Sequence, residues 1–186
     1  MVELSVDFKS KKLDNSTSKV FLRPLARDDA SLEYLSWIQN TELTKFLSLD
    51  PLPLSVDDLA LYIAQIQESP SDFLFGIFEK VNGRHIGNIK LGGINWTHSY
   101  GDVGILLGNS NYHGGGYASD ALILLCDFAF RELNIQKLIA GVHDENFASS
   151  NLFTKTGFTL DGIQTLQFVD RSGKRFNRLL FGLLKS

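Results

Sequence analysis

The chain has 186 residues, of which 44% are hydrophobic and 21% are charged, and its formal net charge is −3. This is the composition of an ordinary globular domain, and the small negative charge excludes a basic surface built for nucleic acid. No stretch is apolar enough for a membrane span or a signal peptide. A single cysteine, Cys126, excludes an internal disulfide and a multi-cysteine metal site, so we expect a cytoplasmic protein without a metal.

Residues 1–18 predict a lysine-rich lead-in that is partly mobile or forms an extra edge strand, because apolar residues alternate at its start. The rest of the chain contains no internal repeat and no linker-like stretch. We therefore expect one domain over residues 19–186.

The next segment predicts a short strand followed by two helices. The strand covers residues 20–22 and ends before a proline. Asp28 and Asp29 are expected as the N-cap region of the first helix, and Ser55 opens the second in a near capping box. Residues 40–53, between the two helices, are expected to be irregular.

The middle of the chain predicts a hairpin, a third strand and a long helix. Residues 73–78 and 85–94 are apolar and strand-like, and an Asn-Gly pair between them is a hairpin signal. A third strand is expected within residues 101–107. Apolar residues then recur at helical spacing over residues 118–130.

The C-terminal part predicts a buried strand at residues 137–142 and a short helix at 146–156, with Gly157 as the residue after its C-cap. Further strands are expected at residues 158–160, 166–169 and 179–184, with a hairpin turn at residues 170–173. The order of elements predicts a mixed α/β domain whose central sheet is partly antiparallel.

A glycine cluster, residues 114–116, lies between the third strand and the long helix. Such a loop can direct backbone N–H groups and a helix N-terminus at an anion. The alternative is a plain strand-to-helix turn. The spacing of the glycines matches neither the Walker A loop nor the dinucleotide fingerprint of a Rossmann unit.

The stretch His113-Gly-Gly-Gly-Tyr-Ala118 resembles the Gln/Arg-x-x-Gly-x-Gly/Ala signature of the GCN5-related N-acetyltransferases, in the form typical of the RimJ/RimL branch. A second motif follows one helix and one strand later, as this family requires. It matches Asn-x-x-Ser-x-x-Leu-x-x-Lys-x-Gly-Phe at Asn146, Ser149, Leu152, Lys155, Gly157 and Phe158. The resemblance covers about residues 19–184.

This resemblance implies an N-acetyltransferase (GNAT) fold, with a mostly antiparallel sheet of about six or seven strands and about four helices. The sheet would be splayed where the cosubstrate acetyl-CoA enters. Backbone groups of the glycine loop would wrap the pyrophosphate, and an N–H of the preceding strand would bind the thioester oxygen. The implied acetyl-CoA contacts are Leu106, Leu107, His113, Gly114, Gly115, Gly116, Tyr117, Ala118, Ser119, Asn146 and Phe153.

The chemistry needs a proton acceptor, because an alkyl amine is protonated at neutral pH. Asp102 matches an acidic residue that often opens this strand in the family. The alternative is a solvated carboxylate at the strand end. Glu145 and His143 are weaker candidates for the base, and His85 and His98 are expected to be turn and surface histidines.

The departing thiolate needs a proton donor, which many family members supply from a tyrosine. Phe153 occupies that position here and cannot donate. Ser149, or a water that it holds, is the expected substitute, although Ser149 could be an ordinary helix serine.

The resemblance does not identify the acceptor, which is expected to contact segments 37–49, 96–100 and 164–178. A small-molecule or peptide amine is expected, such as a nucleotide-linked amino sugar or a protein N-terminal amine, and neither nucleic acid nor membrane. The enzyme could act as a homodimer. The alternative function is a GNAT-like domain that senses acyl-CoA without turnover.

Overall fold

The computed structural model describes residues 6–46, 53–169 and 173–186. A seven-stranded sheet has the spatial order β1-β2-β3-β4-β5-β7-β6. Neighbouring strands are antiparallel except β4 and β5, which run parallel. This confirms the predicted mixed, mostly antiparallel sheet. The strands are β1 (Val20–Pro24), β2 (Phe73–Glu79), β3 (His85–Asn95), β4 (Tyr100–Leu107), β5 (Lys137–His143), β6 (Thr159–Val169) and β7 (Arg175–Leu184).

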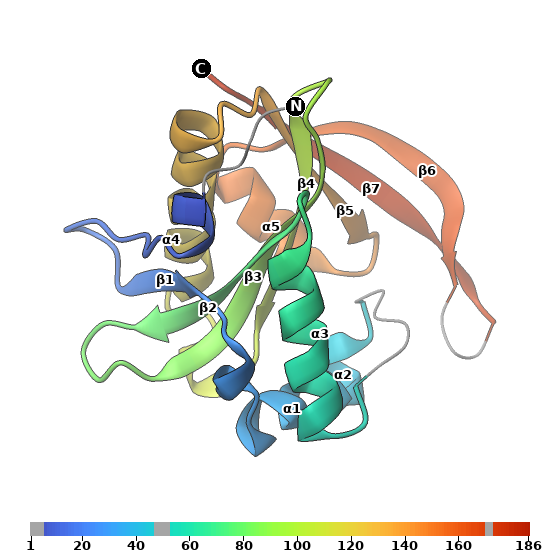
Figure 1. Cartoon of the computed structure of the whole chain (residues 1–186). Helices are drawn as coiled ribbons and strands as arrows, with labels where there is room; N and C mark the ends of the chain where they lie inside the picture. Colours follow the sequence, from blue (N-terminus) through green and yellow to red (C-terminus); the bar gives the residue numbers. More distant parts are fainter. Residues whose placement is uncertain (1–5, 47–52, 170–172) are drawn as a thin grey trace.

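Helices cover both faces of the sheet. The α-helices are α1 (Leu32–Gln39), α2 (Thr41–Thr44), α3 (Val56–Glu68), α4 (Tyr117–Asp127) and α5 (Phe147–Lys155). Figure 1 shows α1–α3 gathered on one face and α4 and α5 on the other. One apolar cluster joins the sheet to α4 and α5, and a second joins it to α1 and α3. β6 and β7 extend away from the body as a long arm (Figure 1).

The sheet is splayed between its two parallel strands. β4 pairs with β5 only over residues 100–102 and 137–139. Beyond Asp102, β4 stays paired with β3 as far as Leu107, while β5 stays paired with β7 as far as His143. The two strands therefore diverge, and each keeps one unpaired edge facing the gap. This is the opening that the resemblance implied.

Local capping follows the sequence closely in α3 and α5. The Ser55 hydroxyl accepts the Asp58 N–H at 3.1 Å, and the Asp58 carboxylate accepts the Ser55 N–H at 3.0 Å. The Asn146 side chain caps α5 by accepting the Ser149 N–H. Gly157 follows α5 with φ +93°. Both predicted starts and the predicted end are confirmed, because a cap depends on residues within one turn.

The start of α1 was predicted wrongly. Ser31, and not the Asp28–Asp29 pair, is the N-cap, and its hydroxyl accepts the Tyr34 N–H at 3.1 Å. Asp29 instead makes an ion pair with Arg23 at 2.6 Å within a 3₁₀ turn. The carboxylate also accepts the Ala26 N–H at 2.7 Å at the start of that turn, so it is engaged there and does not cap α1.

Three other expectations differ from the structure. Residues 41–44, expected to be irregular, form α2, because the Asn40 side chain caps them. The two separate strands expected at 158–160 and 166–169 are one strand, β6, whose pairing with β7 continues through two irregularities. Within the lead-in, Val6–Lys9 forms a 3₁₀ turn and not part of an edge strand.

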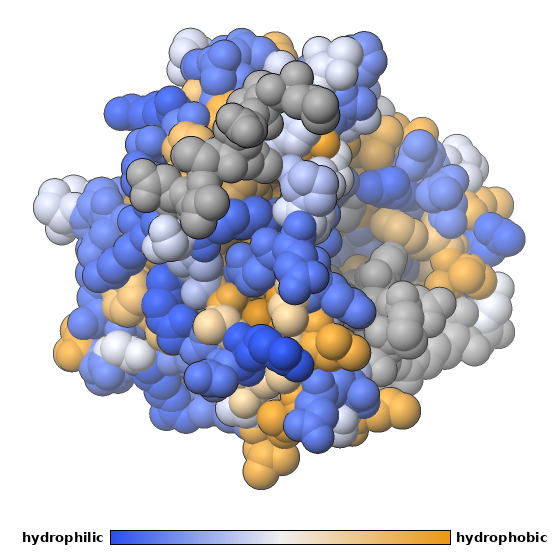
Figure 2. All heavy atoms as spheres, viewed as in Figure 1, coloured by the Kyte–Doolittle hydropathy of each residue, from blue (hydrophilic) through white to orange (hydrophobic). Residues whose placement is uncertain are grey.

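Parts of the predicted lead-in, the segment between the helices and the turn at 170–173 fall on residues 1–5, 47–52 and 170–172, outside the described residues. The division into a lead-in and a single domain stays a prediction. Figure 2 shows that hydrophilic residues cover much of the face bearing α3, with hydrophobic residues in small groups among them.

Candidate acyl-CoA site

A cavity of about 520 Å³ lies between the end of β4, the glycine loop, the start of α4, the outer side of α5 and the short helix α2. The predicted residues that line it are Leu106, Leu107, His113, Gly114, Gly116, Tyr117, Ala118, Ser119, Asn146 and Ser149. A smaller cavity of about 60 Å³ lies in the splay between β4 and β5. The residues shared by both cavities are Phe46, Ile105, Asn146 and Ser149, so the two meet beside α5.

The glycine loop leaves a run of backbone donors free. Gly114 and Gly116 have φ of +73° and +85°, which only glycine adopts without strain. Gly116 is the N-cap of α4, and no side chain caps that helix. None of the N–H groups of residues 114–119 donates to another described residue. Orphan donors at a helix N-terminus, in a cavity wall, are of the kind that can bind an anion.

Lys19 adds a positive charge beside this loop, and sequence analysis missed it. Its ammonium donates to the Gly115 carbonyl at 2.7 Å, and its backbone N–H donates to Asp120 at 2.7 Å. Gly115, predicted to contact the cosubstrate, lines neither cavity and instead binds Lys19. No sequence signal could have paired Lys19 with a loop so far along the chain.

The open edge of β4 presents alternate backbone groups to the gap. The Gly108 N–H donates to Ile86 of β3 at 3.0 Å. In an antiparallel ladder the direction alternates, so the amides of Ile105 and Leu107 point away from β3. The His113 ring nitrogen Nε2 donates to the Leu107 carbonyl at 2.8 Å, which is consistent with this direction. Leu106 directs its side chain to the α1–α3 cluster.

α5 supplies the opposite wall of the splay. Asn146 Oδ1 accepts the Ser149 N–H at 3.1 Å, which leaves Asn146 Nδ2 unused among the described residues. The Ser149 hydroxyl also makes no hydrogen bond to a described residue. Phe153 is buried against Phe158 and Phe181 and lines the smaller cavity. One wall of the splay is therefore apolar, and the free polar groups lie at its mouth.

Asp102 is the last residue of β4 that pairs with β5, so it lies where the two strands begin to diverge, which we call the root of the splay. It lines neither cavity. The structure thus separates it from Ser149, its predicted catalytic partner. Burial raises the pKa of the Asp102 carboxyl, against the opposing effect of the cations Arg178 and Lys90. The nearest atom of Arg178 is 3.5 Å from the carboxylate.

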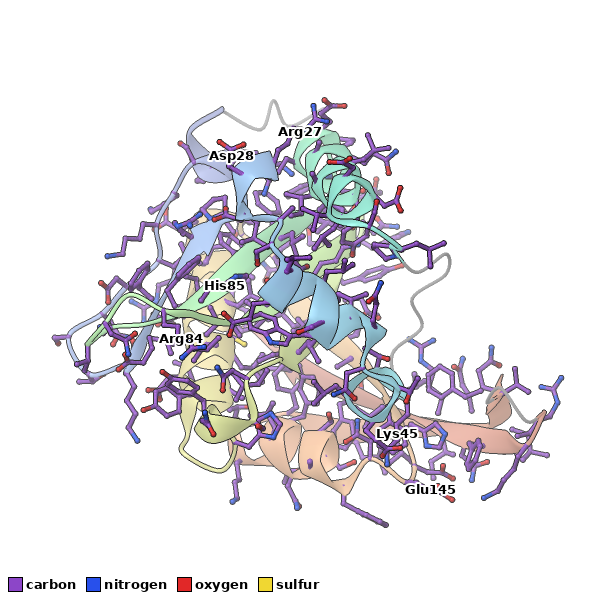
Figure 3. The ribbon with its side chains drawn as sticks, turned by 90° about the horizontal axis from the view of Figure 1, so that it is seen from below. Arg27, Asp28, Lys45, Arg84, His85 and Glu145 are labelled. Atoms are coloured by element: carbon purple, nitrogen blue, oxygen red, sulfur yellow. The ribbon has the colours of Figure 1, made fainter. Side chains whose placement is uncertain are left out.

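The two weaker candidates for the base lie near the end of β5. His143 is buried, lines the smaller cavity and packs against Phe46 with ring centroids 4.8 Å apart. Its Nδ1 accepts the Glu145 N–H at 3.2 Å. Glu145 itself is exposed and pairs with Lys174 at 3.2 Å. Figure 3 shows Glu145 and Lys45, the residue before Phe46, on the same side of the molecule.

His85 was predicted to be a turn or surface histidine, and this was wrong. Its ring packs against Trp37 and Phe78, and its Nε2 lies 3.0 Å from Asn88 Oδ1. Burial lowers the His85 pKa. The ring lies beneath α1, away from both cavities (Figure 3). His98 is an exposed turn residue, as expected.

Aromatic residues of the expected acceptor segments are mostly structural. Phe46 lies two residues after the end of α2 and lines both cavities. Trp37 is buried in the α1–α3 cluster, and the Trp96 indole donates to the Pro70 carbonyl at 3.2 Å. Neither tryptophan lines a cavity.

No group of three or more potential metal ligands occurs among residues 6–46, 53–169 and 173–186. None of the helices in this part of the chain is both long and apolar enough to cross a membrane.

Free N–H donors at a helix start lie beside a splayed strand pair, the arrangement that the resemblance implied for an acetyltransferase. A family model described as an acetyltransferase (GNAT) domain matches residues 19–159. The chain belongs to this family, in its RimJ/RimL-like group, and is an acetyl-CoA-dependent N-acetyltransferase.

Known relatives agree with this assignment. The spermidine N(1)-acetyltransferase of Escherichia coli K12 is 30% identical over 148 residues, which cover 79% of this chain and 76% of the relative. The N-acetyltransferase p20 of Bacillus licheniformis is 26% identical over 171 residues, covering 91% of this chain and 94% of the relative.

Two solved structures share the fold. Spermidine N-acetyltransferase from Vibrio cholerae, in complex with CoA and spermine, has a TM-score of 0.81 at 22% identity, covering 90% of this chain and 96% of that chain. RimJ from Mycobacterium smegmatis, with CoA-disulfide, has a TM-score of 0.82 at 18% identity, covering 94% and 88%.

Proposed function

We propose that the enzyme transfers an acetyl group from acetyl-CoA directly to a primary amine while both substrates are bound. The observation that carries the proposal is the run of free N–H groups at residues 114–119, beside the open edge of β4. These groups fit a pyrophosphate, with Lys19 and the Ser119 hydroxyl beside them. The extended thioester arm would then run along β4 towards the smaller cavity.

Backbone and side-chain donors would hold the thioester. The alternation of amides along β4 favours Leu107 over Leu106 as the oxyanion donor, and it adds Ile105 as a second candidate. Asn146 Nδ2, which is free while Oδ1 caps α5, would bind the pantetheine arm.

We assign the base to Asp102, directly or through a water. The acceptor ammonium would lose one proton to this carboxylate, and the neutral nitrogen would attack the thioester carbon. The new C–N bond forms as the C–S bond breaks. A second nitrogen proton is lost to solvent. The Ser149 hydroxyl, or a water that it holds, donates a hydrogen bond to the departing thiolate, which then takes a proton from solvent, so the products are an amide and free CoA thiol.

The acceptor would be a small-molecule or peptide amine, with a nucleotide-linked amino sugar or a protein N-terminal amine as the starting candidates. Similar proteins are named for the acetylation of spermidine. We also retain a cytoplasmic location, because the chain has a single cysteine, Cys126, and so no internal disulfide.

Incubation with acetyl-CoA and a broad amine panel should release free thiol with at least one amine, followed with a thiol reagent. The panel contains amino sugars, N-terminal peptides, amino acids and polyamines. Binding of acetyl-CoA by calorimetry without thiol release from any amine would instead support the sensor alternative.

Replacing Ser149 by alanine should lower kcat about tenfold, because a hydrogen bond to the charged sulfur is lost, while acetyl-CoA affinity stays close to that of the wild type. Steady-state thiol release measures the change. The matched control is Ser150→Ala, since the Ser150 hydroxyl is buried in the same helix without a partner among the described residues. Equal rates for the two variants would show Ser149 to be an ordinary helix serine.

A further inference from the structure

The guanidinium of Arg178 crosses from β7 over β5 to the root of the splay. Arg178 pairs with His143 in the sheet register. A Cβ added to Gly141 would lie 2.0 Å from Arg178 Nε, so the guanidinium rests against the β5 backbone at that glycine. Its far end reaches Asp102 of β4, with Nη2 3.5 Å from the carboxylate.

The donors of this guanidinium are almost unused. Arginine carries five N–H donors in a rigid fork that matches a carboxylate. Arg178 Nε is buried and has no hydrogen-bond partner among the described residues. The contact with Asp102 is longer than the ~2.7–2.9 Å of a charge-assisted hydrogen bond. A cation in this state, next to a cavity, is suited to an anionic group of a ligand.

The position of Arg178 is on the side where an acceptor would enter. Val103 and Ile105 direct their side chains to the cluster of α4 and α5, whereas Leu106 packs on the α1–α3 side. Because side chains alternate along a strand, Asp102 also faces the α1–α3 side. Gly141, under the guanidinium, lines the smaller cavity together with Ser149.

We propose that Arg178 and Asp102 form a subsite for an acceptor that bears a carboxylate next to its reacting amine, as an α-amino acid does. Arg178 binds the carboxylate, and Asp102 faces the ammonium that it deprotonates. This inference rests on the proposed acetyl transfer and names its substrate class. The step adds no further reactant, since bond changes and proton transfers are those given above.

The same charges disfavour a polyamine. A polyamine carries several cations and no anion, and it would meet the cation Arg178, whose ion-pair partner among the described residues is Asp102. Among the described residues that line the two cavities, Glu42 is the acidic residue. Lys155 also lines the larger cavity, and its positive charge offsets that of Glu42. Like charges at close range lower affinity.

Matched substrates test the subsite. The best substrate among the common L-amino acids is compared with the amine that lacks only its carboxylate, for example lysine with cadaverine, and spermidine is a third arm. The wild type should show kcat/KM at least about tenfold higher for the amino acid than for its decarboxylated partner or for spermidine.

Arg178→Gln should abolish that preference, because KM for the amino acid rises about tenfold or more relative to KM for the bare amine. Gly141→Ala should act in the same direction, because the new methyl displaces the guanidinium without removing its charge. The matched control is Arg175→Gln on the same strand, where the side chain binds the Leu166 carbonyl at the exposed arm. This control should keep the preference.

Better turnover of the bare amine or of spermidine than of every amino acid would overturn the subsite alone. An unchanged preference in Arg178→Gln would do the same. Absence of thiol release with every amine would overturn the proposed acetyl transfer itself, so the two failures are distinct.

Discussion

Gly116→Asp is expected to abolish acetyl-CoA binding. Gly116 has φ +85°, where a side chain costs about 1–2 kcal/mol in backbone strain. The nearest atom to an added Cβ is Lys19 Nζ at 3.8 Å, so aspartate fits sterically. Its carboxylate would lie among the N–H donors proposed for the pyrophosphate, and repulsion at about 4 Å costs several kcal/mol. Calorimetry should show affinity reduced by about a hundredfold or more.

The matched control is Gly116→Asn, which has the same size and tolerates the left-handed conformation but carries no charge. We expect this variant to keep measurable acetyl-CoA binding and a melting temperature close to that of Gly116→Asp. Unchanged affinity in the aspartate variant would contradict the assignment of this loop to the pyrophosphate. Equal loss in both variants would assign the effect to backbone strain.

Asp102→Asn is expected to lower kcat by about 10²–10⁴-fold, because the amide cannot accept the proton of the amine. Acetyl-CoA affinity should not change, since Asp102 lines neither cavity. The dependence of kcat on pH tests the protonation state of Asp102. Burial raises the Asp102 pKa, so the wild-type rate should fall as the pH drops through that raised pKa and the carboxylate becomes protonated. The deficit of the variant should be largest above the Asp102 pKa and below the pKa of the acceptor amine, where the wild type carries the carboxylate and the neutral amine is rare, and it should shrink at lower pH.

Kcat measured against pH for the wild type and the variant tests this role. The control is Asp28→Asn, an exposed carboxylate in the 3₁₀ turn before α1. Full activity of Asp102→Asn at all pH values would leave Asp102 as a strand-end carboxylate with no part in proton transfer.

The features that sequence alone determined are local in the chain. The positive φ of the glycine loop, the Ser55 and Asn146 caps and the end of α5 at Gly157 each depend on residues within a few positions. The sequence spacing of the two motifs also predicts their position in the fold, because the one helix and one strand between them bring both motifs to the same cavity. Residue type and spacing therefore suffice for the loop, the start of α3, both ends of α5 and the family.

Only the tertiary structure decided which residues meet across the splay. Lys19 reaches Gly115, Phe46 reaches both cavities, and Arg178 reaches Asp102, through contacts between elements far apart in sequence. Nothing near Arg178 in sequence indicates that Gly141 leaves room for its guanidinium. Such contacts depend on strand order and register, since β7 lies beside β5 and β4 leaves β5 after Asp102. Hydrophobic burial and strand pairing across the whole sheet set these relations, and so the charge of the acceptor subsite could be read only from the fold.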